Sequence, residues 1–200
     1  MTGKFISFEG GDGAGKTTQI GKLAERLEAA GTEVVVTREP GGTELGLAIR
    51  QALLHGEDLS PRTEALLYAA DRAHHIATVV RPALDRGATV ITDRYMDSSI
   101  AYQGAARGLG MDTIGDLNSW AVDGLMPDLT FLLDLDPVIG ATRIGAAKDR
   151  LESAGDAFHA QVRRTFLDLA GREPERFVII DASGSPEQIS EEIGMAYGRL

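Results

Sequence analysis

The chain has 200 residues, of which 43% are hydrophobic and 25% charged, as is ordinary for one globular domain with a core of its own. Its formal net charge is −10, and it has no run of basic residues of the kind that binds nucleic acid. It contains no cysteine, so disulfides and thiol chemistry are excluded.

The first predicted elements are a strand over residues 4–9 and a helix over 17–30. The strand is a short apolar run that ends in glycines, and the helix has apolar residues at helical spacing before it stops at Gly31. The segment between them, Gly10 to Thr18, fits the pattern G-x-x-x-x-G-K-S/T. With a strand before it and a helix after it, this segment is predicted to be a phosphate-binding loop (P-loop) for a nucleoside triphosphate.

The predicted P-loop supplies the groups that a triphosphate needs. Its glycines let backbone N–H groups turn inward around an anion, and the following helix adds the positive end of its dipole. Lys16 is expected to reach the β- and γ-phosphates, and the Thr17 hydroxyl to ligate Mg²⁺. The residues expected to bind the triphosphate are Gly10, Gly11, Asp12, Gly13, Ala14, Gly15, Lys16, Thr17 and Thr18.

A second strand is predicted over residues 33–37, followed by a loop and by helices over 44–54 and 63–86. Pro82 should kink the second of these helices or end its regular part, because proline has no backbone N–H. In the same helix, His74 and His75 are expected at the helix surface or at an interface rather than in a metal or acid–base site.

The third predicted strand, residues 88–92, leads into Asp93 and Arg94. A carboxylate at the end of such a strand can hold Mg²⁺ directly or through water. GTPases normally carry an N-K-x-D signature, but the one asparagine of this chain, Asn118, is followed by serine and tryptophan. ATP-driven motors keep a glutamate where this chain has Arg94, which cannot act as a base but can neutralise phosphate. The pattern therefore favours transfer to a phosphorylated acceptor over hydrolysis.

The remaining elements complete an alternation of strands and helices, with continuous apolar runs at 34–36 and 131–133. They are predicted as helices over 98–106 and 111–124, a strand over 129–133, two helical segments within 138–171 with a break near 145–147, a strand over 177–180 and a helix over 185–199. Alternation of this kind calls for parallel pairing, and both apolar runs are expected to be buried on both faces of the sheet. The predicted fold is α/β: a P-loop NTPase three-layer sandwich with a five-stranded parallel sheet and helices on both faces. Residues 1–200 are expected to form one domain.

Five ordered motifs resemble those of the thymidylate kinase family in its bacterial form, over essentially the whole chain. They read FEGGDGAGKTT from Phe8, TREPGGT from Thr37, LYAADR from Leu67, DRYMDSSIAYQ from Asp93 and PDLT from Pro127. The resemblance implies a nucleoside monophosphate kinase that transfers the γ-phosphoryl group of ATP to dTMP, giving dTDP and ADP in dTTP synthesis. It also implies Mg²⁺ as cofactor and a homodimer.

The resemblance assigns an acceptor site as well. Tyr68 and Arg72 lie four residues apart on one helix face, where a ring can stack on thymine and a guanidinium can meet the base. Ser99 and Gln103 have the same spacing and can present a hydroxyl and an amide to the edge of a base. The residues implied to bind dTMP are Glu39, Pro40, Arg50, Tyr68, Arg72, Arg94, Ser98, Ser99, Tyr102 and Gln103, with Arg94 bridging the two phosphates.

A lid is predicted at about 143–152 that closes over ATP. Bacterial relatives usually lack an arginine inside the P-loop, and Gly13 stands at that position here, so basic groups should come from the lid. The front half of this lid is uncharged, which departs from the family and leaves Arg143, Lys148 and Arg150 as candidates. The expected catalytic residues are Lys16, Arg94, Asp12, Arg143 and Arg150, and the expected metal ligands are Thr17 and Asp93. Residues 181–183 are expected near adenine by family analogy.

Two other functions stay open on the sequence. One is a P-loop kinase for another acceptor, such as UMP, CMP or a deoxynucleoside. The other is a nucleotide-binding regulatory protein without catalysis, which would show damage at Lys16, Thr17, Asp93 or Arg94, and all four are intact. The expected partners are ATP and dTMP, with neither nucleic acid nor membrane. The start of the chain lacks a signal peptide's apolar region and no run of about 18 apolar residues occurs, so a cytoplasmic location is expected.

Overall fold

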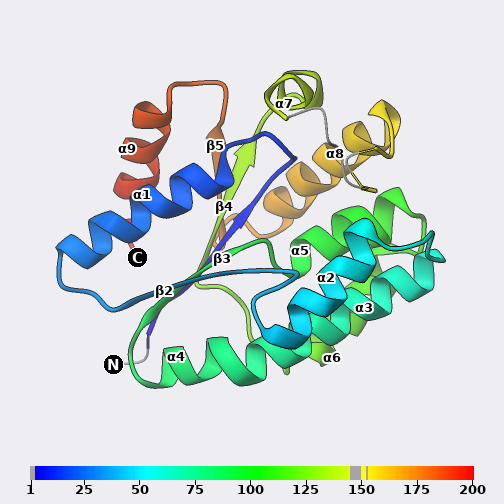
Figure 1. Cartoon of the computed structure of the whole chain (residues 1–200). Coiled ribbons are helices and arrows are strands. Elements are labelled where there is room, and N and C mark those ends of the chain that lie inside the picture. The colour runs from blue at the N-terminus through cyan, green and yellow to red at the C-terminus, as the bar shows by residue number, and fades with distance from the viewer. Residues whose placement is uncertain (1–2, 145–149, 152) are drawn as a thin grey trace.

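The computed structural model describes residues 3–144, 150–151 and 153–200. Within these ranges, five strands form one sheet: β1 (Phe5–Glu9), β2 (Val34–Arg38), β3 (Thr89–Asp93), β4 (Leu129–Asp134) and β5 (Phe177–Asp181). Neighbouring strands are all parallel, and their order across the sheet is β2-β3-β1-β4-β5 (Figure 1). The predicted five-stranded parallel sheet is therefore confirmed.

The helical segments of the described residues follow the predicted alternation. They are α1 (Lys16–Ala29), α2 (Glu44–His55), α3 (Pro61–His75), α4 (Arg81–Asp85), α5 (Met96–Ser99), α6 (Met111–Ala121), α7 (Pro137–Arg143), α8 (Asp156–Arg172) and α9 (Pro186–Tyr197), with π-helical segments η1 (Ile76–Val80) and η2 (Ile100–Ala106). Regular α-helical bonding ends in η1, one turn before Pro82, and resumes in α4. The break expected at this proline is confirmed.

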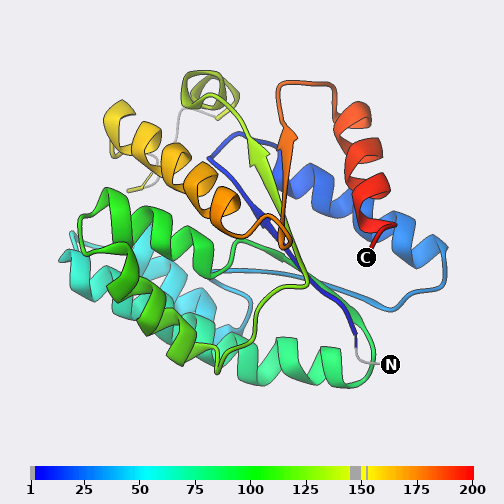
Figure 2. The ribbon, with the colours of Figure 1, turned by 180° about the vertical axis from the view of Figure 1, so that it is seen from behind.

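Helices cover both faces of the sheet, as the two views from opposite sides show (Figures 1 and 2). α1 and α9 lie on one face, and α8 lies on the other with the helices between β2 and β4. Neighbouring residues of a strand point to opposite faces, so Ile6 packs into the core under α1 while Phe5 packs into the core on the other side. In β4, Phe131 likewise packs on the α1 side of the sheet and Leu132 on the other side. The three-layer α/β sandwich is confirmed.

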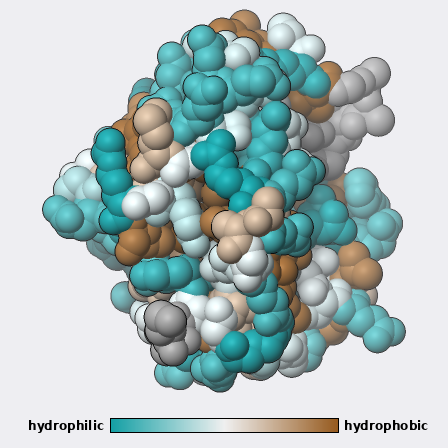
Figure 3. Space-filling view, turned by 90° about the vertical axis from the view of Figure 1, so that its left-hand side faces the viewer, coloured by the Kyte–Doolittle hydropathy of each residue, from teal (hydrophilic) through white to brown (hydrophobic). Residues whose placement is uncertain are grey.

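The outer surface of α1 and α9 is mostly hydrophilic, and its hydrophobic areas are small and separate (Figure 3). The inner face of α1 buries Ile20, Leu23 and Leu27 at helical spacing, which ties the helix to the sheet. α9 begins at a capping box, in which the Ser185 side chain accepts from the backbone of Gln188 and the Gln188 side chain accepts from the backbone of Ser185.

The prediction that β2 is buried on both faces is wrong. β2 lies at an edge of the sheet and pairs only with β3, so its side chains are partly exposed, and Val36 is 53% exposed. The matching prediction for residues 131–133 is correct, because β4 lies between β1 and β5 and is covered by helices on both faces. An apolar run of the same appearance thus occupies two different positions in the sheet.

The carboxyl ends of β1, β2 and β3 lie at one edge of the sheet, because parallel strands all end on the same side. Each of the three leads directly into a motif singled out from the sequence: the P-loop after β1, residues 39–43 after β2, and Arg94 after β3. No helix in the described part of the chain is long and apolar enough to cross a membrane.

Candidate active site

The P-loop turns tightly between β1 and α1, as its glycines predict. Gly10, Gly13 and Gly15 have φ angles of 133°, 77° and 89°, a region in which any side chain would be strained. The Lys16 ammonium is folded back onto the loop, where it donates to the carbonyl oxygens of Gly10 and Gly11, both at 3.0 Å. Burial lowers the pKa of Lys16, and the charge of Arg94 lowers it further. The lysine is thus held at the loop that should surround the phosphates.

Thr17 and Asp93 offer oxygen ligands of the kind that Mg²⁺ prefers. The Thr17 hydroxyl donates to Asp93 Oδ2 at 3.5 Å, and Asp93 Oδ1 is buried with no hydrogen-bond partner among the described residues. A buried carboxylate oxygen without a partner needs an explanation, and Mg²⁺ is usually held by one or two protein oxygens together with substrate phosphates. The residues present therefore fit the ion expected from the sequence.

Arg94 is held in a strained conformation beside the P-loop. Its φ of 70° lies in the left-handed region that residues other than glycine rarely adopt. Its Nη1 donates to the Gly10 carbonyl at 3.2 Å and to Ser98 Oγ at 3.1 Å, and its Nη2 is paired with Asp12. The guanidinium also lies over the Tyr102 ring, 5.2 Å from its centroid. Contacts on several sides thus fix the direction in which this charge points.

Asp12 of the P-loop and Arg94 after β3 form a charged pair. Burial opposes the charge of Asp12, but Arg94 and Lys16 outweigh it, so the pKa of Asp12 is lowered. Burial likewise opposes the charge of Arg94, while Tyr102 and Asp12 favour it, and its pKa is raised. Both groups are therefore ionised at neutral pH.

Glu9 is a buried carboxylate below this pair. Its Oε1 accepts from the backbone N–H groups of Tyr95 at 2.8 Å and Ser98 at 3.2 Å, and its Oε2 accepts from Ser98 Oγ at 2.6 Å. Burial, with a smaller contribution from Asp97, raises the pKa of Glu9 to about 7 against the opposing effect of Arg94. These bonds hold the turn that carries Arg94. Glu9 was not predicted as a site residue, although a charged residue in an apolar strand is a signal of a buried functional carboxylate.

A cavity of about 680 Å³ extends from the P-loop to the loop after β2. P-loop residues 12–18 line one end of it, together with Asp93. The other end is formed by the residues that the sequence assigned to an acceptor: Glu39, Pro40, Arg50, Tyr68, Arg72, Arg94, Ser98, Ser99, Tyr102 and Gln103. The fold therefore brings both predicted groups around one space, except that Gly10 and Gly11 are not among its lining residues.

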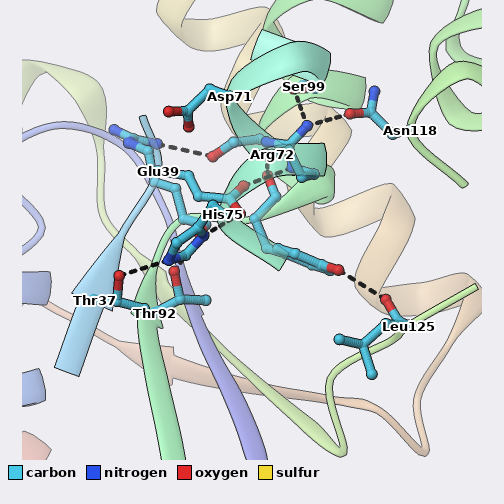
Figure 4. Close-up of polar contacts among 12 residues, drawn as sticks. Thr37, Glu39, Asp71, Arg72, His75, Thr92, Ser99, Asn118 and Leu125 are labelled. Carbon is cyan, nitrogen blue, oxygen red and sulfur yellow. Dashed lines mark hydrogen bonds and ion pairs between the residues drawn. The ribbon is translucent and has the colours of Figure 1, made fainter. Parts of the chain in front are cut away.

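Arg72 is buried at the acceptor end and is held by four hydrogen bonds (Figure 4). Its Nε donates to Glu39 Oε2 at 2.6 Å and its Nη2 to the Tyr95 carbonyl at 3.1 Å. Its Nη1 donates to Ser99 Oγ at 2.9 Å and to Asn118 Oδ1. A guanidinium has five N–H groups, so one on Nη2 is left without a partner among the described residues.

The expectation that His75 lies at the helix surface or at an interface is wrong. Its side chain is fully buried, with Nδ1 2.8 Å from Glu39 Oε1 and Nε2 2.7 Å from Thr37 Oγ1 (Figure 4). The loop after β2 covers the face of α3 that carries both Arg72 and His75, which lie three residues apart. Glu39 is thus held through both of its oxygens. Sequence spacing did not show which face of α3 would be covered.

The comparisons with known proteins agree with this geometry. Residues 8–193 match the model of the family described as thymidylate kinase. A thymidylate kinase from Clavibacter michiganensis subsp. michiganensis is 59% identical over 197 residues, which cover 96% of this chain and 93% of the relative. One from Bifidobacterium longum (strain NCC 2705) is 58% identical over 94% of each chain, and one from Deinococcus radiodurans is 50% identical over 97% of this chain and 96% of the relative.

The chain belongs to the thymidylate kinase family. The resemblance read from the five motifs is therefore confirmed. In this thymidylate kinase family member, the motif that begins at Asp93 supplies residues at both ends of the cavity, from Asp93 itself to Gln103.

The two described arginines of the predicted lid lie in different places. Arg143 lines the cavity and donates to the carbonyl oxygens of Gly13 at 3.4 Å and Ala182 at 3.1 Å. Arg150 instead donates from Nε to the Leu53 carbonyl at 3.0 Å. Its Nη2 is ion-paired with Glu64 at 2.6 Å, and Arg150 is not part of the cavity lining. Lys148 and the rest of 145–149, with residue 152, lie outside the described residues.

The cavity has one further wall, at the start of α9. Its lining residues are Gly184, Pro186 and Ile189, which follow residues 181–183 directly. The expected adenine contacts at residues 181–183 stay a prediction. Ala182 contributes its carbonyl to Arg143.

Proposed function

We propose that this enzyme transfers the γ-phosphoryl group of ATP to dTMP, giving ADP and dTDP, and that it does so in the cytoplasm for dTTP synthesis. The observation that carries the proposal is the continuous cavity, with a P-loop at one end, a pocket of fixed polar groups at the other, and Arg94 between them. Membership of the thymidylate kinase family supports the same assignment of donor and acceptor.

The P-loop end is proposed to bind and orient ATP. Backbone N–H groups of residues 10–18 and the N-terminus of α1 surround the phosphates, and Lys16 moves from the loop carbonyls to the β- and γ-phosphates. Thr17 and Asp93 are proposed to hold Mg²⁺, which when bound neutralises charge on the transferred group. The unpaired Asp93 Oδ1 supports this role.

Arg94 is proposed to bridge the donor and acceptor phosphates. An oxygen of the dTMP phosphate attacks the γ-phosphorus while the bond to the β–γ bridging oxygen breaks, so charge develops on both sides. The acceptor oxygen is already an anion, and the reaction needs positioning and positive charge more than a base. Asp12 and Tyr102 keep the guanidinium directed at this point.

Arg143 is the lid arginine that we propose to act on the ATP phosphates, because it lines the cavity at the P-loop. Arg150, which the sequence placed beside it in this role, has its guanidinium paired with Glu64 and lies behind the acceptor pocket. Its position supports an anchoring role for the end of the predicted lid rather than contact with phosphate.

A panel of acceptors tests the proposed reaction. The purified enzyme, with ATP and Mg²⁺, is offered dTMP, dUMP, dCMP, dGMP, UMP, CMP and thymidine, and ADP release is measured for each. We expect the highest kcat/KM for dTMP. A higher value for another acceptor would favour the alternative kinase, and no turnover with any of them would favour a non-catalytic nucleotide-binding protein.

Replacing the bridging arginine gives a sharper test. Arg94→Ala should lower kcat by about 10³-fold or more, because comparable arginines are worth about 10³–10⁵ in rate. The affinity for ATP, measured by calorimetry, should change little. Arg86→Ala is the matched control, since Arg86 forms an exposed ion pair with Glu33 away from the cavity. Near-normal turnover in Arg94→Ala would contradict the bridging role.

We also propose that residues 1–200 act as one nucleoside monophosphate kinase domain with its lid at about 143–152, and that two copies form a homodimer through α3 and α6. These helices pack against each other, and each exposes a large apolar side chain, with Leu66 58% and Trp120 82% exposed. Light scattering on the purified protein measures the mass, and a monomer at micromolar concentration would contradict the dimer.

A further inference from the structure

Glu64 is a carboxylate of α3 that is fully buried behind the acceptor pocket. Its Oε1 accepts from Gln103 Nε2 at 2.8 Å and, more weakly, from Arg107 Nε at 3.4 Å. Its Oε2 is paired with Arg150 Nη2 at 2.6 Å and with Arg107 Nη2 at 3.3 Å. One carboxylate therefore joins the helix that carries Gln103 to the end of the predicted lid.

The contact with Glu64 determines how the Gln103 amide is turned. A carboxylate paired with two guanidinium groups offers only acceptor oxygens, so Gln103 must direct its NH₂ group at Glu64. The amide oxygen, Oε1, then faces away from Glu64 and accepts no hydrogen bond from the described residues. Because Gln103 lines the cavity, this oxygen is the acceptor that a ligand would meet.

Arg72 supplies the complementary donor. Four of its five N–H groups are bound by the protein, which fixes the plane of the guanidinium, and one N–H on Nη2 remains. Ser99, which accepts from Arg72, lies four residues before Gln103, so the two groups are tied to the same helical stretch. Arg72 and Gln103 both line the cavity, so the pocket has one N–H donor and one amide oxygen that no described residue occupies.

This pair matches one class of pyrimidine and opposes the other. A 4-oxo pyrimidine such as thymine or uracil has an acceptor at O4 and a donor at N3–H. A 4-amino pyrimidine such as cytosine has a donor at N4 and an acceptor at N3, the reverse at both positions. A site built from buried hydrogen-bonding groups discriminates strongly when its groups are left unpaired.

We propose that Glu64 is the positioning residue that makes the enzyme choose 4-oxo over 4-amino pyrimidine nucleotides, because it holds the Gln103 amide in one orientation. The inference rests on the proposed function, since it concerns the acceptor of that reaction. Glu64 itself touches no substrate and acts through Gln103.

Glu64→Gln tests the proposal with little change in size. The new amide should turn its oxygen toward Arg107 and Arg150 at the Oε2 position, and its NH₂ group then faces Gln103. The Gln103 amide oxygen must then accept a hydrogen bond from this NH₂ group, so the NH₂ group of Gln103 turns to the cavity. We expect the ratio of kcat/KM for dTMP to that for dCMP to fall by at least about tenfold. An unchanged ratio, with both values lowered equally, would show a merely structural role and overturn the proposal.

Arg107→Ala is the matched control, because it removes a partly exposed partner of the same carboxylate and leaves the bond between Glu64 and Gln103 in place. Its dTMP to dCMP ratio should equal that of the wild type. In a Gln103→Leu background, adding Glu64→Gln should leave the ratio where Gln103→Leu alone put it. A further tenfold change in the double variant would overturn the proposal.

The outcomes separate this proposal from the reaction on which it depends. A wild-type enzyme that phosphorylates none of the nucleotides refutes the proposed function. A wild type that prefers dTMP, with an unaltered ratio in Glu64→Gln, refutes the role of Glu64 alone. Should Glu64→Gln fail to fold, Gln103→Leu decides the matter, because it removes the acceptor and must lower the ratio. A ratio preserved in that variant contradicts the inference.

Discussion

Glu9 is one residue on which the position of Arg94 depends, and its environment disfavours its charge. The carboxylate accepts three hydrogen bonds from the turn after β3, yet burial raises its pKa from 4.5 to about 7. Glu9 therefore gains or loses its proton near neutral pH. The carboxylate that changes charge is the same group that accepts the bonds from Tyr95 and Ser98. A group of this kind links the geometry of the site to pH.

The pH dependence of stability tests this assignment. The folded protein binds the Glu9 proton more tightly than the unfolded chain, so the stability from this group is complete below about pH 4.5 and is lost as pH rises through about 7. The free energy of unfolding of the wild type should therefore fall, relative to Glu9→Gln, across that window. Chemical denaturation at a series of pH values measures the difference, and a constant difference would contradict the raised pKa.

Single residues were predictable from the sequence where a motif fixed their place, and not where burial decided their role. Lys16, Thr17, Asp93 and Arg94 stand at fixed distances from strand ends, so their positions followed from the chain itself. Glu9, Glu64 and His75 are buried by segments distant in sequence. A polar residue on an apolar helix or strand does not indicate which face of that element another segment will cover. The same limit applies to the pairing of Arg150 with Glu64, because the two residues are far apart in sequence.

At the scale of elements, α7 approaches the P-loop so closely that only backbone fits between them. A Cβ atom on Gly140 would overlap the carbonyl oxygen of Asp12, and one on Gly13 would overlap the backbone of Gly140. α7 starts at Pro137 behind an Asp136 cap, so its first turn is held over the loop. A shift of α7, the helix that leads into the predicted lid, would therefore also shift the P-loop.

Gly140→Ala should therefore both destabilise the protein and weaken ATP binding. Overpacking at a close backbone contact costs about 1–3 kcal/mol, because α7 must move from the P-loop. Gly171→Ala is the matched control in α8, where no heavy atom lies near the added Cβ, and it should be neutral or stabilising by up to about 1 kcal/mol. Denaturant unfolding and ATP calorimetry on both variants measure this. Equal behaviour of the two variants would rule out the close contact.

Element positions could be predicted from periodicity, while their surroundings could not. All five strands appeared where apolar β-type runs end in turn residues. The edge position of β2 could not be predicted, because the exposure of Val36 depends on which strands pair across the sheet and not on the run of valines. The α/β alternation fixed the architecture, since parallel strands require crossovers, but the sheet order came from the structure.

At the scale of the whole molecule, a buried ion pair joins the site's helix to the far half of the sheet. Arg176, just before β5, donates to both oxygens of Asp97 in α5 at 2.7 and 2.9 Å and to Thr130 Oγ1 at 2.9 Å. Asp97 is buried and lies three residues after Arg94. The pair thus connects the turn of Arg94 to β4 and β5.

Removing one partner of this pair should be far more costly than removing a surface pair. Asp97→Ala leaves Arg176 buried and without its main counter-charge, and we expect a loss of about 3–5 kcal/mol in the free energy of unfolding. Glu33→Ala breaks the exposed pair with Arg86 and should cost at most about 1 kcal/mol. Urea unfolding of both variants gives the comparison. A loss below about 1 kcal/mol for Asp97→Ala would mean that the network does not hold the two halves together.

The contact between Gly13 and Gly140 also limits how this chain can change over evolutionary time. An arginine at Gly13 would need a strained φ of 77° and would overlap the backbone of α7, so a single substitution at this position cannot add positive charge without moving α7. A second change that lifts α7 would have to come first, at the expense of the very packing that positions the loop. Placing an arginine at this position is therefore a two-step path whose first step is harmful.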